Sequence, residues 1–343
     1  MSVKRIIAGG QTKQSSNALF ASSTNGTSWT IIDKSALTGG VNWNVTIAIK
    51  YWANRWVAVG KGTMNNGTVQ MPIITSSDGD NWNPVTFNTP INLPCTINAV
   101  DYSGTVWLAG GSVFYNNSAC PLLYKSTNGI NWTTVYSHTD GYTGSFSDLQ
   151  WVDNMWLVVG NRYTSADNMK YIYRSNNYDA SNMQTISWNK QYGNPEAVTN
   201  FKHNIYIASQ RAPFLRKYNG SWSNVNNPLT VRVTDTSIYR NNNGGDERIV
   251  ICGWVFDKLS IAWSDNGSSF TLASPNNLYD SYISCLSKFF GNSILAGAGY
   301  SGTNNTDGII FYSTNKGENW QIITDTDLKD NFSIFLNIEV AFM

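Results

Sequence analysis

The sequence of 343 residues predicts an all-β fold in which a four-stranded antiparallel unit is repeated seven times. Three observations support this prediction: a polar turn ending in an aromatic residue recurs, short apolar runs surround each turn, and the two chain ends carry complementary parts of one unit. The composition agrees, because aromatic residues make up 13%, charged residues only 13%, and there are 28 glycines. Such a composition suits strands and tight turns better than amphipathic surface helices.

The recurring turn has five well-preserved copies. They read STNGTSW from Ser23, SSDGDNW from Ser76, STNGINW from Ser126, SDNGSSF from Ser264 and STNKGENW from Ser313. Weaker copies are interrupted between Ser175 and Trp188 or reduced to YNGSW at Tyr218–Trp222. The closing aromatic residues are spaced by 53, 50, 56, 34, 48 and 50 residues, and seven units in 343 residues average 49. They are Trp29, Trp82, Trp132, Trp188, Trp222, Phe270 and Trp320. A period of this size predicts a repeat architecture.

Apolar runs of strand length accompany each turn. Two runs joined by a short polar turn come first, as at residues 46–52 and 56–60, where the sequence reads TIAIKYW and WVAVG. A third run leads into the recurring turn and a fourth follows it. Runs of this length, rich in Val, Ile, Tyr and Trp and bounded by Gly, Asn or Asp, indicate antiparallel strands. Four such strands in about 50 residues predict one blade of a β-propeller.

The chain ends predict how the repeat closes. The N-terminal VKRIIAGG matches the second strand of a blade, and the C-terminal FLNIEVAF matches the missing first strand. We therefore expect a seven-bladed β-propeller whose ring is closed by the C-terminal strand pairing into the N-terminal blade, which leaves no open sheet edge. The expected blades are residues 1–36 with 332–343, then 37–90, 91–140, 141–194, 195–228, 229–276 and 277–331.

The recurring turn resembles the Asp-box, or BNR repeat, S-x-D-x-G-x-x-W, which joins the third and fourth strands of blades in sialidases and sortilin-type receptors. Ser313–Trp320 has the full length, with Asn315 at the Asp position, and the other good copies are one residue shorter. The resemblance implies that the turns are structural and lie on the face opposite the usual ligand site. The structural residues expected on this basis are Asn25, Trp29, Asp78, Trp82, Asn128, Trp132, Asn266, Phe270, Asn315 and Trp320.

The opposite face would carry the connections between the second and third strands and between blades. These segments, which include 60–70, 111–120, 161–169 and 299–308, are rich in Asn, Thr, Gly and Tyr. They can hydrogen-bond a hydroxyl-rich ligand while Tyr stacks on a sugar ring, although ordinary solvated loops remain the alternative. Three arginines from neighbouring blades could hold a carboxylate there. The candidate ligand-binding residues are Arg162, Tyr163, Arg211, Arg232, Glu196, Tyr115 and Tyr142.

The arginines with Tyr163 and Glu196 are similar to a sialidase site, which would also need an aspartic acid such as Asp140 or Asp167. The Arg-Ile-Pro signature of sialidases is missing, and seven blades differ from the six of sialidases. We therefore expect a non-enzymatic binding or assembly module whose ligand is a glycan or a partner protein. A virion or phage structural or adhesion component fits this expectation. The alternative is a glycoside hydrolase of sialidase-like type.

Several classes of protein are disfavoured. A net charge of +1 gives no basic excess for nucleic acid. The sequence contains no run of 18 apolar residues, so we expect no membrane insertion. The apolar run before Gly9 is too short for a signal peptide, so we expect a soluble protein that is intracellular or virion-associated.

The four cysteines form no CxxC pair, so we expect neither a metal nor another cofactor. Cys252 and Cys285 lie in apolar runs and are expected to be buried free thiols. Cys95 and Cys120 lie in loop-like sequence, where the residues alone leave a disulfide open.

Overall fold

The computed structural model describes residues 3–13, 17–38, 41–64, 73–88, 93–136, 143–163, 170–229, 232–240, 247–255, 258–274, 281–302, 305–323 and 325–342. The chain divides into two compact units, and we call Met1–Ile32 with Glu196–Met343 the terminal unit and Asp33–Pro195 the middle unit. Both consist of β-sheets, and the described residues contain a single short α-helix, α1 (Thr326–Asn331). The all-β prediction is confirmed. No helix in these ranges is long and apolar enough to cross a membrane.

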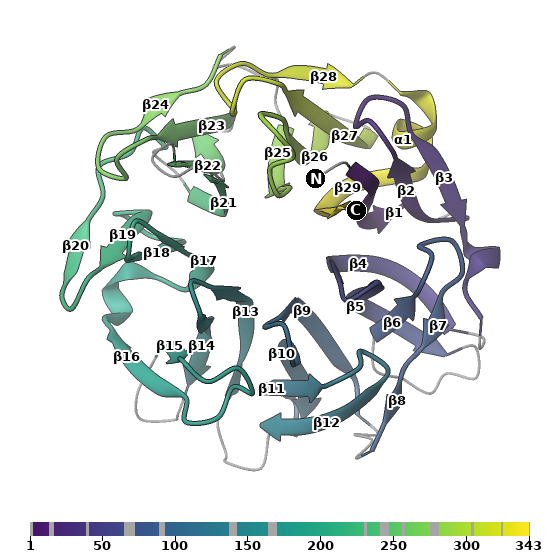
Figure 1. Ribbon diagram of the computed structural model, residues 1–343, viewed down its shortest axis with the longest axis horizontal. Helices are drawn as coiled ribbons and strands as arrows, with labels where there is room; N and C mark the ends of the chain where they lie inside the picture. The colour runs from purple at the N-terminus through teal and green to yellow at the C-terminus, as the bar shows by residue number, and fades with distance from the viewer. Residues whose placement is uncertain are drawn as a thin grey trace. The chain divides into compact units, whose positions relative to one another are not determined.

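The middle unit contains three antiparallel sheets whose strands are hydrogen-bonded in chain order (Figure 1). The first comprises β4 (Val41–Trp52), β5 (Arg55–Met64), β6 (Ile73–Ser76) and β7 (Asn83–Pro84). The second comprises β9 (Cys95–Tyr102), β10 (Trp107–Tyr115), β11 (Ser118–Ser126) and β12 (Asn131–Tyr136), with β8 (Thr86–Phe87) parallel to β12. The third comprises β13 (Thr143–Val152), β14 (Met155–Tyr163), β15 (Lys170–Ser175) and β16 (Gln184–Trp188).

The terminal unit repeats the same arrangement. One sheet comprises β17 (Pro195–Phe201), β18 (Asn204–Ser209), β19 (Leu215–Tyr218) and β20 (Trp222–Asn224). The next comprises β21 (Arg232–Arg240), β22 (Glu247–Val255), β23 (Lys258–Ser264) and β24 (Thr271–Leu272). A further sheet comprises β25 (Ser281–Leu286), β26 (Ile294–Gly302), β27 (Asn305–Ser313) and β28 (Gln321–Ile323). The remaining sheet is formed by both chain ends.

Within the terminal unit, the strands from both chain ends are hydrogen-bonded in the order β29 (Phe332–Phe342), β1 (Val3–Thr12), β2 (Ala18–Ser23) and β3 (Thr30–Asp33). The strands β29 and β1 are antiparallel, with Phe342 opposite Val3 and Phe332 opposite Thr12. Figure 1 shows the two strands side by side near the chain termini. This is the pairing of last strand with first strand that the terminal sequences predict.

A β-bulge recurs where the first strand of a sheet pairs with the second. In β29–β1, β4–β5, β9–β10, β13–β14 and β21–β22 the register shifts near a glycine of the second strand. A Cβ atom on that glycine would lie between 1.9 and 2.3 Å from a carbonyl oxygen of the first strand. Because no side chain fits there, glycine is required for the close approach of the two backbones. The glycines are Gly10, Gly60, Gly111, Gly160 and Gly253.

The recurring polar turns share one hydrogen-bonding pattern. In the first copy, Ser23 Oγ accepts a hydrogen bond from Gly26 N at 2.8 Å, and Gly26 has a φ of 83°. Asn25 Oδ1 accepts from the backbone N–H groups two and three residues later, both at 2.9 Å. The indole of Trp29 donates to Gly26 O at 3.1 Å. The Ser and Asp/Asn acceptors recur in the copies that begin at Ser76, Ser126, Ser264 and Ser313.

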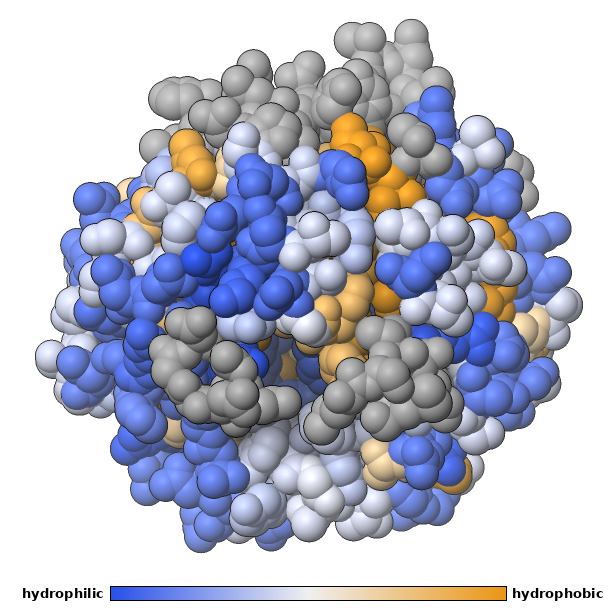
Figure 2. Space-filling model, turned by 45° about the horizontal axis from the view of Figure 1, so that its top comes forward, coloured by the Kyte–Doolittle hydropathy of each residue, from blue (hydrophilic) through white to orange (hydrophobic). Residues whose placement is uncertain are grey.

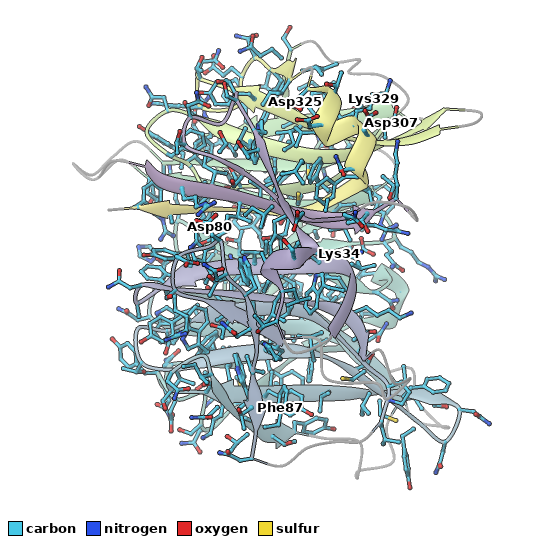
Figure 3. The ribbon with its side chains drawn as sticks, turned by 90° about the vertical axis from the view of Figure 1, so that its right-hand side faces the viewer. Lys34, Asp80, Phe87, Asp307, Asp325 and Lys329 are labelled. Atoms are coloured by element: carbon cyan, nitrogen blue, oxygen red, sulfur yellow. The ribbon has the colours of Figure 1, made fainter. Side chains whose placement is uncertain are left out.

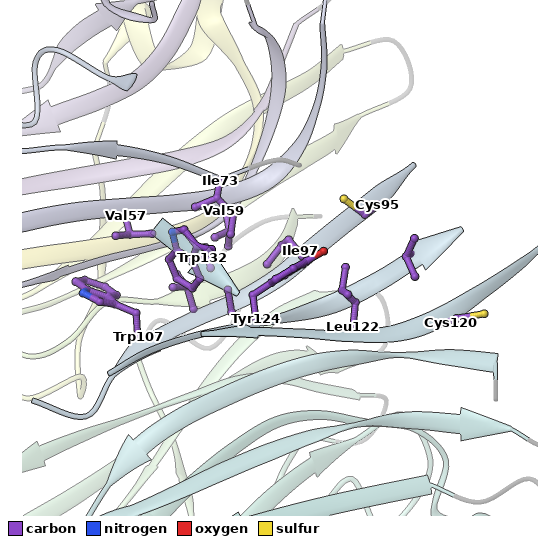
Figure 4. Packing of buried hydrophobic residues seen from close by; sticks show 14 residues of the cluster. Val57, Val59, Ile73, Cys95, Ile97, Trp107, Cys120, Leu122, Tyr124 and Trp132 are labelled. Carbon is purple, nitrogen blue, oxygen red and sulfur yellow. The ribbon is translucent and has the colours of Figure 1, made fainter. Parts of the chain in front are cut away.

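The aromatic residue that ends each turn packs into the core of its unit. In Figure 4, Trp132 lies among buried residues of two neighbouring sheets, with Val57 and Ile73 from one and Ile97 and Trp107 from the other. The backbone at this residue also joins the sheets, because Asn88 N donates to Trp132 O at 2.9 Å. Equivalent contacts link Trp82 N to Ala36 O and Trp320 N to Ser274 O, both at 2.8 Å. The turns therefore fasten sheets to one another within each unit.

The turn at Asp78 is expected to stabilise the protein less at acid pH. The backbone and side-chain N–H groups of Asn81 donate to the carboxylate and hold the pKa of Asp78 well below its ordinary value, and Asp80 N adds a further bond. A carboxyl group with a lowered folded-state pKa stabilises the protein above its unfolded pKa of about 4, and this contribution is lost as the pH falls further.

We expect Asp78→Ala to lower the free energy of unfolding by about 1 kcal/mol, because the turn loses its acceptor. Asp78→Asn keeps an acceptor oxygen, as Asn does in the other four good copies. The stability difference between wild type and Asp78→Asn is expected to be largest at pH 7 and to shrink below about pH 4. Urea unfolding at several pH values measures it, and a difference independent of pH would contradict this assignment.

Two expectations about loops are corrected. Cys95 begins β9 and Cys120 lies in β11, so both belong to strands rather than loops (Figure 4). Segment 111–120 is mostly strand, because β10 and β11 extend to a two-residue turn at Asn116 and Asn117, whose φ values are 46° and 60°. Asparagine tolerates this left-handed conformation, which a two-residue hairpin turn requires.

All four cysteines are free and buried. The prediction of buried free thiols is confirmed for Cys252 and Cys285, and no disulfide joins Cys95 to Cys120. Burial raises the pKa of the Cys95 thiol to about 12. These thiols are therefore packing residues rather than nucleophiles.

Candidate functional site

Four of the polar residues at one end of the terminal unit form a group that we call the Glu196 cluster: Glu196, Gln210, Arg211 and Arg232. Glu196 lies at the start of β17, Gln210 and Arg211 follow the end of β18, and Arg232 is the first residue of β21. In an antiparallel sheet the start of one strand and the end of the next lie at the same end. The strand order therefore brings these residues together although they are up to 36 positions apart.

The centre of the cluster is a carboxylate held by two partners. Arg232 Nε donates to Glu196 Oε2 at 2.6 Å, and Arg232 Nη2 donates to Glu196 Oε1. The side-chain amide of Gln210 donates to the same Oε1 at 2.6 Å. The Glu196 side chain is 13% exposed and that of Arg232 is 35% exposed. This two-point pairing fixes the plane of the guanidinium, so one edge of the arginine is preorganised at the surface.

The β-bulge of β21 sets the position of Arg232. Val233 pairs with Gly253 and Asp235 with Cys252, which leaves Thr234 as the extra residue. The carbonyl oxygen of Arg232 lies 1.9 Å from the position that a Cβ on Gly253 would occupy. Bulges redirect the side chains beside them, and here the bulge follows the arginine directly.

The bulged strand is also anchored to the next sheet. Asp235 Oδ2 accepts a hydrogen bond from Leu286 N of β25 at 2.7 Å, and Asp235 Oδ1 accepts from Thr236 N at 2.7 Å. Both carboxylate oxygens are thus used by backbone donors. Arg232 therefore lies on a strand that is anchored to the neighbouring sheet three residues later.

The short connection that carries Arg211 is held by Ser209. The Ser209 hydroxyl is within hydrogen-bond distance of Arg211 O at 3.2 Å and Pro213 O at 3.3 Å, and Ser209 N donates to Phe214 O at 2.9 Å. The peptide bond between Ala212 and Pro213 is cis. Arg211 itself is exposed. The cluster thus combines the Arg232–Glu196 pair with an exposed residue, Arg211, on the connection after β18, and its two arginines and one glutamate carry a formal charge of +1.

The other predicted ligand-binding residues lie in the middle unit. Arg162 and Tyr163 end β14, opposite Gly144 and Thr143, but their side chains are outside the described part of the structure. Tyr142, Asp140 and Asp167 also lie outside the described residues, as do most of segments 60–70 and 161–169. Convergence of Arg162 with Arg211 and Arg232 stays a prediction.

Tyr115 lies at the end of β10, where its side chain is 40% exposed next to Phe114, which is 50% exposed. Both residues flank the tight turn at Asn116 and Asn117. The predicted exposed position of Tyr115 on a hairpin end is therefore present, and its role in binding stays a prediction.

A second polar group, which the sequence did not single out, surrounds Asp307 in the terminal unit. The carboxylate of Asp307 is buried and accepts a hydrogen bond from Lys13 Nζ at 2.7 Å, while Lys329 Nζ lies 3.5 Å away. Figure 3 shows Asp307, Lys329 and the α1 cap Asp325 at the same end of this unit. The group ties β1, β27 and α1 together, so its role is structural.

The carboxyl groups of the Glu196 cluster bear on whether it could hydrolyse a glycoside. Glycoside hydrolysis requires two carboxyl groups, one of which donates a proton. Among the described members of the cluster Glu196 is the single carboxylate, and both of its oxygens already accept hydrogen bonds. The described His, Cys, Asp and Glu residues also form no group of three or more that could hold a metal ion.

No protein-family model matches the chain, and neither does any curated protein sequence. Solved structures do match. A protein of Bacteroides fragilis, provisionally assigned as a 6-phosphogluconolactonase, has a TM-score of 0.58 at 10% identity and covers 98% of each chain. A GH32 β-fructofuranosidase of Bombyx mori scores 0.35 at 9% identity, with 89% of this chain and 90% of that chain covered. A PL25 ulvan lyase scores 0.48 at 11% identity, with 80% and 81% covered. These neighbours are β-propeller-like, and at such identities the likeness shows the fold alone.

Proposed function

We propose that the chain forms a seven-bladed β-propeller of the Asp-box type, closed by the pairing of β29 with β1. We further propose that it binds an acidic glycan at the Glu196 cluster without cleaving it. The repeated four-stranded sheets, the shared turn geometry and the terminal strand pair support the first part. The arrangement of the cluster supports the second.

The observation that carries the binding proposal is the fixed guanidinium of Arg232, with the exposed Arg211 on the connection after β18. Glu196 holds the guanidinium of Arg232, and Gln210 holds Glu196, so little side-chain entropy is lost when a ligand binds. Arg211 supplies the uncompensated positive charge of the cluster. A carboxylate or sulfate group on a sugar matches a guanidinium in geometry and charge, whereas the outer edges of Gln210 and Glu196 suit sugar hydroxyls.

Hydrolysis by a sialidase-like mechanism is the competing function. It would need a proton donor within reach of Glu196, and a nucleophile that is not already engaged. The engagement of both Glu196 oxygens by Arg232 and Gln210 favours binding alone. A partner protein with an acidic surface is the other competing ligand, and a glycan screen separates it.

The expected result of a screen with sialylated, uronate-containing and sulfated oligosaccharides is binding of at least one acidic class. Arg211→Ala is expected to weaken that binding at least tenfold, because a charge-assisted pair contributes about 1.5–3 kcal/mol. Isothermal titration calorimetry measures the affinity. The matched control is Arg240→Ala, which removes the same charge from the opposite end of β21.

Two outcomes would overturn this proposal. If Arg211→Ala binds the selected oligosaccharide as tightly as wild type, the ligand does not lie on the Glu196 cluster. If new reducing ends accumulate with wild type and not with Glu196→Gln, the protein is a hydrolase. Absence of any acidic glycan among the bound sugars would leave a protein ligand as the better proposal.

A further inference from the structure

Four aromatic side chains cross the ends of three sheets in the middle unit, and we call them the aromatic strip: Trp52, Tyr102, Tyr178 and Trp151. Trp52 and Tyr102 end β4 and β9, Trp151 lies one residue before the end of β13, and Tyr178 lies between β15 and β16. Trp52 is 47% exposed and Tyr178 is 51% exposed, while the other two are partly exposed. Figure 2 shows one face of the protein, on which hydrophilic residues predominate. Trp52 and Tyr178 are among five large hydrophobic residues that are exposed in the described part of the chain.

The rings of the strip form two contacting pairs. The ring centroids of Trp52 and Tyr102 are 6.4 Å apart, and those of Trp151 and Tyr178 are 4.9 Å apart. The two pairs are joined because the Ser103 hydroxyl donates to Tyr178 O at 2.8 Å, which places Tyr178 beside the residue that follows Tyr102. Side chains from three successive sheets therefore contribute to one surface.

Each pair rests on buried aromatic residues that hold it in place. The ring of Tyr102 lies 4.8 Å from that of Trp107, and the ring of Trp151 lies 5.4 Å from that of Trp156. The Trp156 indole also donates to Tyr178 O at 3.0 Å. The strip is thus preorganised, which reduces the entropy lost on binding.

The repeat itself shows that the fold does not require the two most exposed rings. The register aligns Tyr51–Trp56 of the first sheet with Tyr102–Trp107 and Trp151–Trp156 of the next two. The residue after the aligned aromatic is Trp52 in the first sheet, Ser103 in the second and Val152 in the third. A tryptophan at this position therefore occurs in one of these three sheets and is not a feature of the repeat.

Tyr178 has a similar origin. It lies in the insertion that interrupts the recurring polar turn between Ser175 and Trp188. In the five good copies this turn is closed by local hydrogen bonds, whereas here Ser175 Oγ bonds to Ser181 O and the chain between them carries Tyr178 outward. The interrupted turn therefore supplies one ring of the strip.

The exposed residues around the strip indicate which class of ligand it would bind. The exposed neighbours are neutral amides and hydroxyls, with two exposed carboxylates and no exposed arginine or lysine adjacent in sequence. They are Asn54, Thr105, Asn154, Asn177, Asp153 and Asp179. Aromatic faces stack on the apolar face of a pyranose, while amides, hydroxyls and carboxylates accept or donate hydrogen bonds to its equatorial hydroxyl groups. The exposed Lys125 interacts electrostatically with Asp179, so these surroundings carry little net charge and suit a neutral chain better than a sulfated or carboxylated one.

From these observations we infer that the aromatic strip binds a neutral polysaccharide chain laid across three sheets of the middle unit. This surface is separate from the Glu196 cluster, and its ligand differs in charge from the acidic glycan proposed there. Two ring pairs on neighbouring sheets suit an extended chain better than a single monosaccharide. The protein would then recognise two different kinds of sugar through two surfaces.

Affinity electrophoresis in gels containing barley β-glucan, xylan or galactomannan tests the inference, with alginate as the acidic comparison. Wild type is expected to be retarded by at least one neutral polysaccharide. The variant Trp52→Ala with Tyr178→Ala is expected to lose at least tenfold in affinity, whereas Trp52→Phe with Tyr178→Phe is expected to keep most of it. Phe114→Ala, which removes an exposed ring at the other end of β10, is the matched control.

The readouts separate this inference from the proposed function. Arg211→Ala should leave retardation by the neutral polysaccharide unchanged, and the Trp52/Tyr178 alanine variant should leave binding of the acidic oligosaccharide unchanged. An unchanged circular dichroism spectrum and thermal midpoint exclude misfolding of the alanine variant. The inference is overturned if no neutral polysaccharide retards wild type, or if the alanine variant is retarded equally.

Discussion

Replacing Gly111 with alanine is expected to lower the free energy of unfolding by about 3 kcal/mol or more. The added Cβ would lie 2.0 Å from Thr96 O and 2.7 Å from the Cα of Ile97, both backbone atoms of β9. Backbone atoms cannot turn aside as the end of a flexible side chain can. The alanine must therefore push β9 away from β10 and break hydrogen bonds at the bulge of this sheet.

The neighbouring glycine is the control for this substitution. Gly110 precedes Gly111 in the same strand, but a Cβ there would meet side-chain atoms, the nearest being Leu149 Cδ2 at 3.0 Å. Gly110→Ala is therefore expected to cost about 1 kcal/mol or less, because a side chain can move by a few tenths of an ångström. Urea unfolding followed by tryptophan fluorescence compares the two variants. Equal destabilisation by Gly110→Ala and Gly111→Ala would contradict the bulge explanation.

Removal of residues 332–343 is expected to abolish the native fold of the terminal unit. The deletion takes away four buried side chains of the core around β1, namely Phe332, Phe335, Ile338 and Val340. At about 2 kcal/mol for each buried side chain, the loss is about 8 kcal/mol, which is comparable to the whole stability of a typical domain. It also leaves one edge of β1 without its hydrogen-bonding partner, which promotes aggregation.

A circular permutant separates loss of the strand from loss of chain connectivity. Because Phe342 pairs with Val3, residues 332–343 placed before Met1 would enter β1 through Met343, Met1 and Ser2. This three-residue connection has the length of a common hairpin loop. The permuted chain is expected to fold with a thermal midpoint near that of wild type, whereas the truncated chain is expected to be insoluble or to lack the cooperative transition. A soluble, cooperative truncated chain would contradict the proposed role of β29.

The parts of the fold that were predicted are those encoded by local patterns. Alternating apolar runs indicate strands, and the Ser, Asn and Gly of each turn act within four residues of one another, as the bonds around Asn25 show. The pairing of β29 with β1 is long-range, yet the repeat itself predicts it, because each end lacks what the other supplies. In a repeated sequence, a long-range contact can thus be predicted by comparing an incomplete unit with the complete ones.

The parts that were missed depend on which strands lie opposite each other. Gly111 and Gly253 end apolar runs, and nothing in their own segments shows that a partner strand bulges against them. The extension of β10 and β11 to Asn116 and Asn117 differs from the predicted loop. Asn and Ser at the strand ends are typical of turns, so the sequence predicts a longer loop than the two-residue turn that is present. The helix α1 is too short to show a helical period.

The candidate site stays a prediction, and the structure adds where its described residues lie and what they contact. Arg211, Arg232 and Glu196 were expected at one end of neighbouring sheets, and the structure places them there. The sequence interpretation treated the arginines as jointly available to a ligand, whereas Arg232 is already bound by Glu196. Gln210 was not singled out, because an amide next to an arginine has no signal until the carboxylate that it contacts is known.

The most direct test of the account is an experimental structure of the protein with the acidic oligosaccharide that binds it most tightly. We predict seven four-stranded blades, and an uncleaved ligand whose acidic group lies within hydrogen-bond distance of the Arg211 guanidinium, beside the Arg232–Glu196 pair. A ligand bound away from the Glu196 cluster, a cleaved glycosidic bond, or a different number of blades would contradict it.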